Sequence, residues 1–131
     1  MKELVDLATH LAANGCGKIV GSDKNIFVNH MPASVKKGIL VRVDYQGIPV
    51  DHELPGYFKT SFQVIVRNPD YVEGQTLADK VCVILNKERA VVGSMQLHYI
   101  YPAERPFVFP ASEGDYLEFS TVFDACYLLA S

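Results

Sequence analysis

The sequence lacks the features that identify membrane, secreted and nucleic-acid-binding proteins. No apolar run in its 131 residues approaches the roughly 20 residues that a membrane helix needs. Basic residues never form a run longer than the pair Lys36-Lys37, and the net charge is −3, which argues against a protein whose main task is to bind phosphates. Glu3 and Asp6 interrupt the apolar core that a signal peptide requires, so we expect a soluble protein without a targeting segment.

Cysteines are too few and too far apart to form a disulfide framework. The three are Cys16, Cys82 and Cys126, and no CxxC motif is present. An odd number of well-separated cysteines favours reduced thiols and a cytoplasmic folding environment.

The sequence also lacks a phosphate-binding loop. The segment NGCGKIVG has the Gly-Lys pair of such a loop at Gly17 and Lys18. However, Ala12 stands where the first glycine of the motif belongs, and Ile19 replaces the Ser or Thr that would contact magnesium. A helix stop accounts for these glycines, and we expect no bound nucleotide.

No histidine has the spacing of a metal ligand such as HxxxH. Asp51, His52 and Glu53 are consecutive, and neighbours on an extended chain point in alternate directions, so they make a poor metal cage. Glu118 and Asp124 would lie roughly 20 Å apart on one strand, which is too far for paired acid and base catalysis. A Cys–His pair or an acid pair assembled across strands remains open. We expect neither a cofactor nor catalysis.

The elements that the sequence does contain predict an α+β fold in a single domain, residues 1–131. Helical periodicity covers residues 2–13, with Leu4, Ala8, Leu11 and Ala12 on one face, and Asn14-Gly15 ends that helix. Asp70 is predicted to cap a second helix, with Glu73 three residues on in the reciprocal pattern of a capping box. Segments 24–32, 38–47, 57–67, 94–101 and 116–129 are predicted strands. We expect a mostly antiparallel sheet of four to five strands with both helices on one face.

A long loop, residues 46–57, separates two of the predicted strands. It contains two glycines, two prolines and the triplet Asp51, His52 and Glu53. Loops of about twelve residues in compact domains are often functional or mobile, so this loop is a candidate contact site.

Two further surfaces are candidates for contacts. Val72 and Val83 fall beside Thr76 and Asp79 on the outer side of the second helix. They are either scattered surface valines, which are common, or a patch that faces a partner. The sheet face away from the helices is expected to carry a set of polar residues, which indicates either a solvated face or a polar subunit interface. The set is Arg42, Asp44, Lys59, Gln63, Arg67, His98, Glu118 and Asp124.

The aromatic residues are expected to serve packing. Strand alternation places Tyr99 and Tyr101 on one face with Met95 and Leu97. Base stacking is disfavoured, because no Arg or Lys alternates with the aromatics and the net charge is negative. Core and loop packing is therefore predicted for six aromatic residues. They are Tyr45, Tyr57, Tyr99, Tyr101, Phe107 and Phe109.

The whole pattern resembles the tail terminator, or tail completion, and minor capsid proteins of long-tailed bacteriophages. The resemblance rests on GILVRVDY, then FQVIVRNPDYVEGQTLADKVCVILN, then YLEFSTVFDACYL. It implies a structural virion protein at the head-proximal end of the tail, assembled in the host cytoplasm. Such a protein forms a ring, typically hexameric, that caps the tail tube, ends its polymerisation and offers a surface for head–tail joining.

The resemblance also implies partners: further copies of the chain, the tail tube protein and a head–tail connector protein. DNA would pass the lumen without specific binding, and no membrane is involved. Residues expected at the subunit or tube contacts are Val72, Val83, Asp79, Arg42, Lys59, Arg67, Asp51, His52 and Glu53. The alternatives are a head-completion or neck protein of related fold, and a small ligand-binding domain or enzyme with a pocket near His52 or His98.

Overall fold

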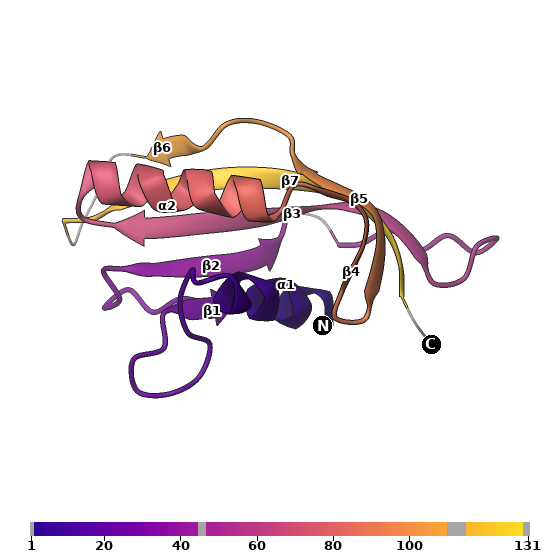
Figure 1. Cartoon of the computed structure of the whole chain (residues 1–131), viewed down its shortest axis with the longest axis horizontal. Coiled ribbons are helices and arrows are strands. Elements are labelled where there is room, and N and C mark those ends of the chain that lie inside the picture. Colours follow the sequence, from indigo (N-terminus) through magenta and orange to yellow (C-terminus); the bar gives the residue numbers. More distant parts are fainter. Residues whose placement is uncertain (1, 45–46, 110–114, 130–131) are drawn as a thin grey trace.

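Two helices cover one face of a seven-stranded sheet in the computed structural model, which describes residues 2–44, 47–109 and 115–129 (Figure 1). In chain order the elements are α1 (Lys2–Ala13), β1 (Ile26–Val28), β2 (Gly38–Val43), β3 (Tyr57–Asn68), α2 (Tyr71–Ile84), β4 (Lys87–Val92), β5 (Met95–Pro102), β6 (Phe107–Phe109) and β7 (Leu117–Leu129). Tyr45 and residue 46, the first of the predicted loop, lie outside the described residues.

The sheet has the strand order β1-β2-β3-β7-β5-β4, and β6 also pairs with β7. The pair β1–β2 is parallel and the other pairs are antiparallel. The α+β class and the mostly antiparallel sheet are therefore confirmed. The predicted number of strands was too small, because β4 and β6 were not expected. β4 begins with three charged residues, and β6 is only three residues long, in a proline-rich segment.

Helix α1 is fixed to the sheet by its apolar side and by two carboxylates. Leu4, Leu7 and Leu11 are buried against the sheet; Leu7 was not in the predicted stripe. The Tyr127 hydroxyl donates a hydrogen bond of 2.9 Å to Glu3 Oε2 in a buried position. Burial, and then Glu3, raise the pKa of the Tyr127 hydroxyl well above its usual range.

The second carboxylate of α1 holds the turn between β4 and β5. Asp6 Oδ2 accepts hydrogen bonds from the Ser94 amide at 2.9 Å and from the Ser94 hydroxyl at 2.6 Å. Gly93 in this turn has a φ of 58°, and a Cβ there would lie 2.2 Å from the Asp6 carboxyl group. Glycine is required at position 93 because a side chain would collide with this anchor.

Helix α2 starts as predicted but uses only half of the expected capping box. Asp70 Oδ2 accepts a hydrogen bond of 3.1 Å from the Glu73 amide. The reciprocal bond from Glu73 to the Asp70 amide is not formed, because that amide donates to Asn68 Oδ1 at 2.8 Å. The Glu73 carboxylate instead lies 3.3 Å from Lys37 Nζ. Asp70 therefore caps α2 with its side chain and is bonded through its amide to Asn68, the last residue of β3.

The contact of α2 with the sheet is close at one point. A Cβ on Gly74 would lie 2.2 Å from the ring of Phe119 in β7. Further along the helix Ala78 and Val81 are buried, and so is Leu85 at its C-terminal cap. The small residue at position 74 lets α2 approach the strands β3 and β7 that lie beneath it (Figure 1).

A β-bulge in β5 changes which side chains of that strand face the helices. Leu97 pairs with Tyr127 of β7, whereas Tyr99 pairs with Cys126, so two residues on β5 span one step on β7. Beyond the bulge Ile100 is buried and Tyr101 is exposed. The prediction that Tyr99 and Tyr101 share a face with Met95 and Leu97 was therefore wrong, because one additional residue reverses the alternation.

Candidate interaction surfaces

The described residues contain no group of three or more His, Cys, Asp or Glu side chains that could hold a metal ion. No helix among them is long and apolar enough to cross a bilayer. The three cysteines are free, and burial raises the pKa of the Cys16 and Cys82 thiols. A thiol with a raised pKa forms less of the nucleophilic thiolate, so these two cysteines are poorly suited to a Cys–His catalytic pair.

The outer side of α2 carries the two valines that the sequence placed there. Val72 is 70% exposed and Val83 is 76% exposed. Between them lie Thr76, whose hydroxyl bonds to the Val72 carbonyl, and Asp79, which accepts a hydrogen bond from Gln75. We call Val72, Thr76, Asp79 and Val83 the helix patch. Its only charged side chain is Asp79.

The sheet face opposite the helices, here called the open face, carries hydrogen-bonded polar side chains in its centre. The Ser61 hydroxyl donates to Asp124 Oδ1 at 2.9 Å, and Gln63 Nε2 donates to Ser120 Oγ at 2.8 Å. Both bonds join neighbouring strands β3 and β7. Such bonds satisfy these polar groups within the monomer.

The predicted contact residues on the open face fall into two groups. Lys59 is exposed and Arg42 is half-buried, so both residues contribute to the molecular surface. Arg67, by contrast, is only 8% exposed. Its Nη1 donates to the carbonyls of Pro32 and Val35 at 2.9 and 3.0 Å.

The charge of Arg67 is also neutralised within the chain. Arg67 Nη2 lies 3.1 Å from Glu118 Oε2, and the guanidinium carbon lies 4.4 Å from the centre of the Tyr116 ring. Arg67 therefore fastens the segment before β2 to the sheet, and its side chain has little surface left for another molecule.

A row of four aromatic side chains lines the edge of the open face. Tyr99 and Tyr101 stack with ring centres 5.0 Å apart, and Phe107 and Phe109 meet edge to face at 4.9 Å. Their strand partners on β7, in the order Phe109, Phe107, Tyr101 and Tyr99, are Glu118, Ser120, Asp124 and Cys126. We call these four residues the aromatic row.

The aromatic row is solvent-accessible, which corrects the prediction of core and loop packing for its members. Phe107 is 57% exposed, Phe109 is 47% exposed and Tyr101 is 42% exposed. The three residues FVF are too few to give an alternation signal, and the bulge that brings the tyrosines onto the same face leaves no signal in the sequence. A row of large exposed aromatics is unusual for the surface of a monomer.

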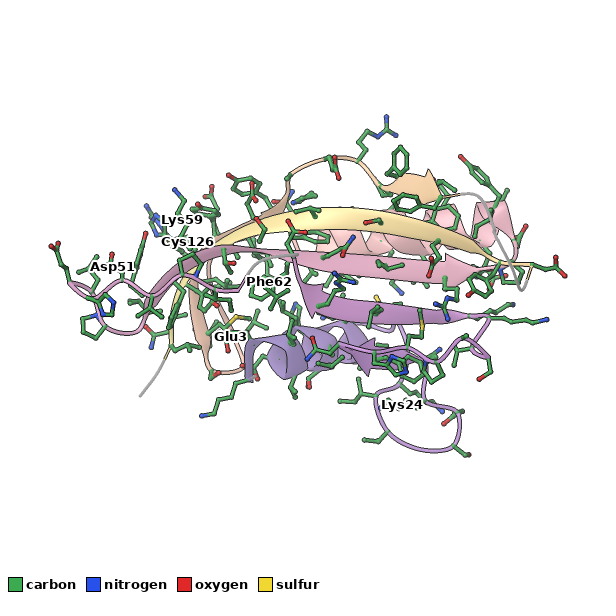
Figure 2. The ribbon with its side chains drawn as sticks, turned by 180° about the vertical axis from the view of Figure 1, so that it is seen from behind. Glu3, Lys24, Asp51, Lys59, Phe62 and Cys126 are labelled. Carbon is green, nitrogen blue, oxygen red and sulfur yellow. The ribbon has the colours of Figure 1, made fainter. Side chains whose placement is uncertain are left out.

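The loop between β2 and β3 projects from the end of the sheet, with Asp51 near its outer end (Figure 2). Asp51 Oδ1 accepts hydrogen bonds from the amides of Glu53 and Leu54 at 2.9 and 3.3 Å, so this aspartate shapes the turn. Val50 and Leu54 are exposed beside it. The loop thus presents apolar and charged groups together.

Surface hollows border both histidines of the ligand-binding alternative. One hollow of about 540 Å³ is lined by residues 49–53, Tyr57 and Lys59, and another of about 490 Å³ includes His98, Arg89 and Tyr57. Asp51, His52 and Glu53 are all exposed. A hollow lined by exposed loop residues gives the acid and base groups no desolvated setting in which a reaction could be promoted.

The chain is similar in sequence to a protein family and in fold to a chain of a virion structure. The family described as bacteriophage tail terminator protein matches residues 10–128. No curated protein sequence matches the chain significantly. A chain of the solved structure described as the virion of a native gene transfer agent (GTA) particle superposes with a TM-score of 0.66 at 15% identity, covering 97% of this chain and 96% of that one.

At that identity the structural likeness bears on the fold, and the family match bears on the role. The matched segment runs from the end of α1 to the penultimate residue of β7, so it includes α2, the open face and the projecting loop. The chain therefore belongs to the bacteriophage tail terminator proteins, which are structural proteins of the virion tail.

Proposed function

We propose that the chain forms a ring, with six copies as the expected number, that caps the tail tube and ends its polymerisation. The ring would then present a surface to a head–tail connector protein at the head-proximal end of the tail, after assembly in the host cytoplasm. The observation that carries this proposal is that a tail terminator family match coincides with two unlike exposed surfaces on opposite sides of one sheet.

Two unlike surfaces suit a ring because a head-to-tail contact, repeated around an axis, closes when the rotation between copies divides a full turn. The helix patch with Val72, Asp79 and Val83 is one such surface. The open face with Arg42 and Lys59 is the other. Arg67 is left out of this contact because its side chain is buried by its own chain.

The projecting loop is proposed to contact the tube protein along the axis of the tail. Asp51, His52 and Glu53 would supply polar contacts, and the exposed Val50 and Leu54 would supply apolar ones. With a net charge of −3, a ring of such copies would repel DNA from its wall rather than bind it. No specific nucleic-acid or membrane partner is proposed.

Negative-stain microscopy of the purified protein, alone and mixed with tail tubes, tests the proposal together with the solution mass. We expect rings, or caps at one end of tubes of uniform length. A protein that forms no ring and leaves tubes uncapped would overturn it.

A loop variant separates ring formation from tube binding. In the variant Asp51→Ala/His52→Ala/Glu53→Ala we expect a folded protein that still self-associates but caps tubes poorly. The matched control replaces exposed charges in a different loop, Asp23→Ala/Lys24→Ala, and should cap normally. Normal capping by the triple variant would show that the loop does not contact the tube.

A further inference from the structure

The helix patch and the aromatic row lie on opposite sides of the same sheet. α2 packs on the side of Phe119, as the approach of Gly74 to that ring shows. Phe107 and Phe109 pair with Ser120 and Glu118, whose side chains point the other way. One chain therefore cannot bring these two surfaces together, and a contact between them needs a second copy.

The dimensions of the two surfaces match. The β7 partners of the aromatic row span nine residues, from 118 to 126, and the eight steps between the first and the last cover about 27 Å at strand rise. Helix α2 has 14 residues, or about 21 Å at helical rise. The aromatic row is thus long enough to receive the whole exposed side of α2.

The charges at the two surfaces are complementary. Asp79 is the one charge in the helix patch, since the neighbouring Lys80 directs its ammonium group to the Gly15 carbonyl. Lys59 and Tyr99 lie on either side of Cys126 in β7 and border a hollow of about 490 Å³. The acids near the row, Asp124 and Glu118, accept hydrogen bonds from their own sheet.

We propose that the aromatic row of each copy receives the helix patch of the next copy, with Asp79 facing Lys59 across the contact. This inference rests on the proposed ring and identifies the residues that build it. The exposed aromatics would bury most of the apolar surface at the contact, and aromatic residues contribute most of the binding energy in many interfaces. Because the contact joins two unlike surfaces, every copy has the same orientation relative to the next copy.

Two variants, each with one damaged surface, test this contact. Val83→Asp damages the helix patch and Phe107→Asp damages the aromatic row; both positions are exposed in the monomer, so folding should persist. Val20→Asp, at a position that is 74% exposed in a loop far from both surfaces, is the matched control. Circular dichroism and the Tm verify folding, and Tyr101→Asp replaces Phe107→Asp if the latter unfolds.

The readout is amine cross-linking of copies with different tags, in the presence of purified tail tubes. Each variant alone should lose cross-linked species larger than the monomer by about ten-fold or more, whereas Val20→Asp should match the wild type. A mixture of Val83→Asp and Phe107→Asp copies should recover dimers but nothing larger. In such a pair the intact row of one variant receives the intact helix patch of the other.

Three other outcomes have distinct meanings. If the wild type and both variants all form rings and cap tubes, the proposed contact is wrong and the proposed ring is retained. If the mixture yields no dimers, the two surfaces do not meet each other, and this inference fails. If the mixture yields dimers but the wild type neither rings nor caps, the contact stands and the proposed function fails.

Discussion

The two faces of the sheet use the same residue types for different purposes. On the covered face Phe62, Phe119 and Phe123 are fully buried beneath the helices. On the open face Phe107 and Phe109 are roughly half exposed although they belong to the same sheet. Phenylalanine on the first face stabilises the monomer, whereas on the second it offers apolar surface that the monomer does not use.

Polar groups show the same division. The buried Tyr127 hydroxyl and the Glu3 carboxylate pair with each other under α1, because an unpaired polar group there would destabilise the fold. Lys59 on the open face is exposed to solvent. The comparison teaches that the covered face carries most of the packing that stabilises the monomer, and that exposed residues of the open face, such as Phe107, are expected to tolerate substitution.

The largest expected effect on stability is the difference between the same substitution made on the covered face and on the open face. Phe62→Ala should destabilise the protein by about 3–5 kcal/mol, because it removes a fully buried ring and leaves a cavity. Phe107→Ala, the matched change on the open face, should alter the free energy of unfolding by less than about 1 kcal/mol. Urea denaturation of both variants measures the difference, and similar losses for the two would remove the distinction between the faces.

The next effect tests how closely α2 approaches the covered face. Gly74→Ala should gain about 1 kcal/mol of helix propensity, yet we expect a net loss of about 1–3 kcal/mol. The added Cβ would lie 2.2 Å from Phe119 and must displace the helix. Gly47→Ala is the control, since a Cβ there meets nothing within 4 Å. A gain in Tm for Gly74→Ala would show that α2 packs less closely than described.

The smallest effect concerns pH and the buried tyrosine. Because the pKa of Tyr127 is raised in the folded protein, the folded and unfolded states bind the same protons at this hydroxyl below pH 10. Above pH 10 the unfolded chain loses the proton and the folded chain keeps it. The stability should therefore fall as the pH rises, by up to about 1.4 kcal/mol per pH unit from this group.

The variant Tyr127→Phe isolates that contribution. It should be less stable at neutral pH by about 1–3 kcal/mol, because Glu3 loses its buried donor, and its stability should depend less steeply on pH above 10. Tyr101→Phe on the open face controls for loss of a hydroxyl as such. An unchanged slope between pH 9 and 11.5 in urea titrations of Tyr127→Phe would contradict the assignment.

Most of the covered face could be predicted from the sequence, because its signals are local. The helix over residues 2–13, the strands over 57–67 and 116–129 and the Asp70 cap each depend on neighbours within a few residues. The missing strands β4 and β6 lacked such signals. β4 is an edge strand that begins with three charged residues, and β6 is a three-residue strand whose position depends on its pairing with β7.

The surfaces were harder to predict, because they depend on which segments meet. Val72 and Val83 were identified correctly as exposed, since the helix alone sets their direction. Arg67 was expected at a contact, but segment 32–35, distant in sequence, covers it. The aromatic row consists of residues from β5 and β6, which lie near each other because both strands pair with β7. The spacing of these residues along the sequence does not reveal that pairing.

The bulge in β5 changes whether odd-numbered or even-numbered residues of the strand face the core. Odd-numbered Met95 and Leu97 face the core before it, and even-numbered Ile100 does so after it. Removal of one of the two bulge residues would restore one-to-one pairing with β7 and leave Ile100 buried and Tyr101 exposed, whereas removal of both would place Leu97 next to Ile100 and reverse the alternation beyond them. Residue number in this strand therefore behaves as a reading frame that the bulge shifts by one, so that core-facing positions are odd before it and even after it.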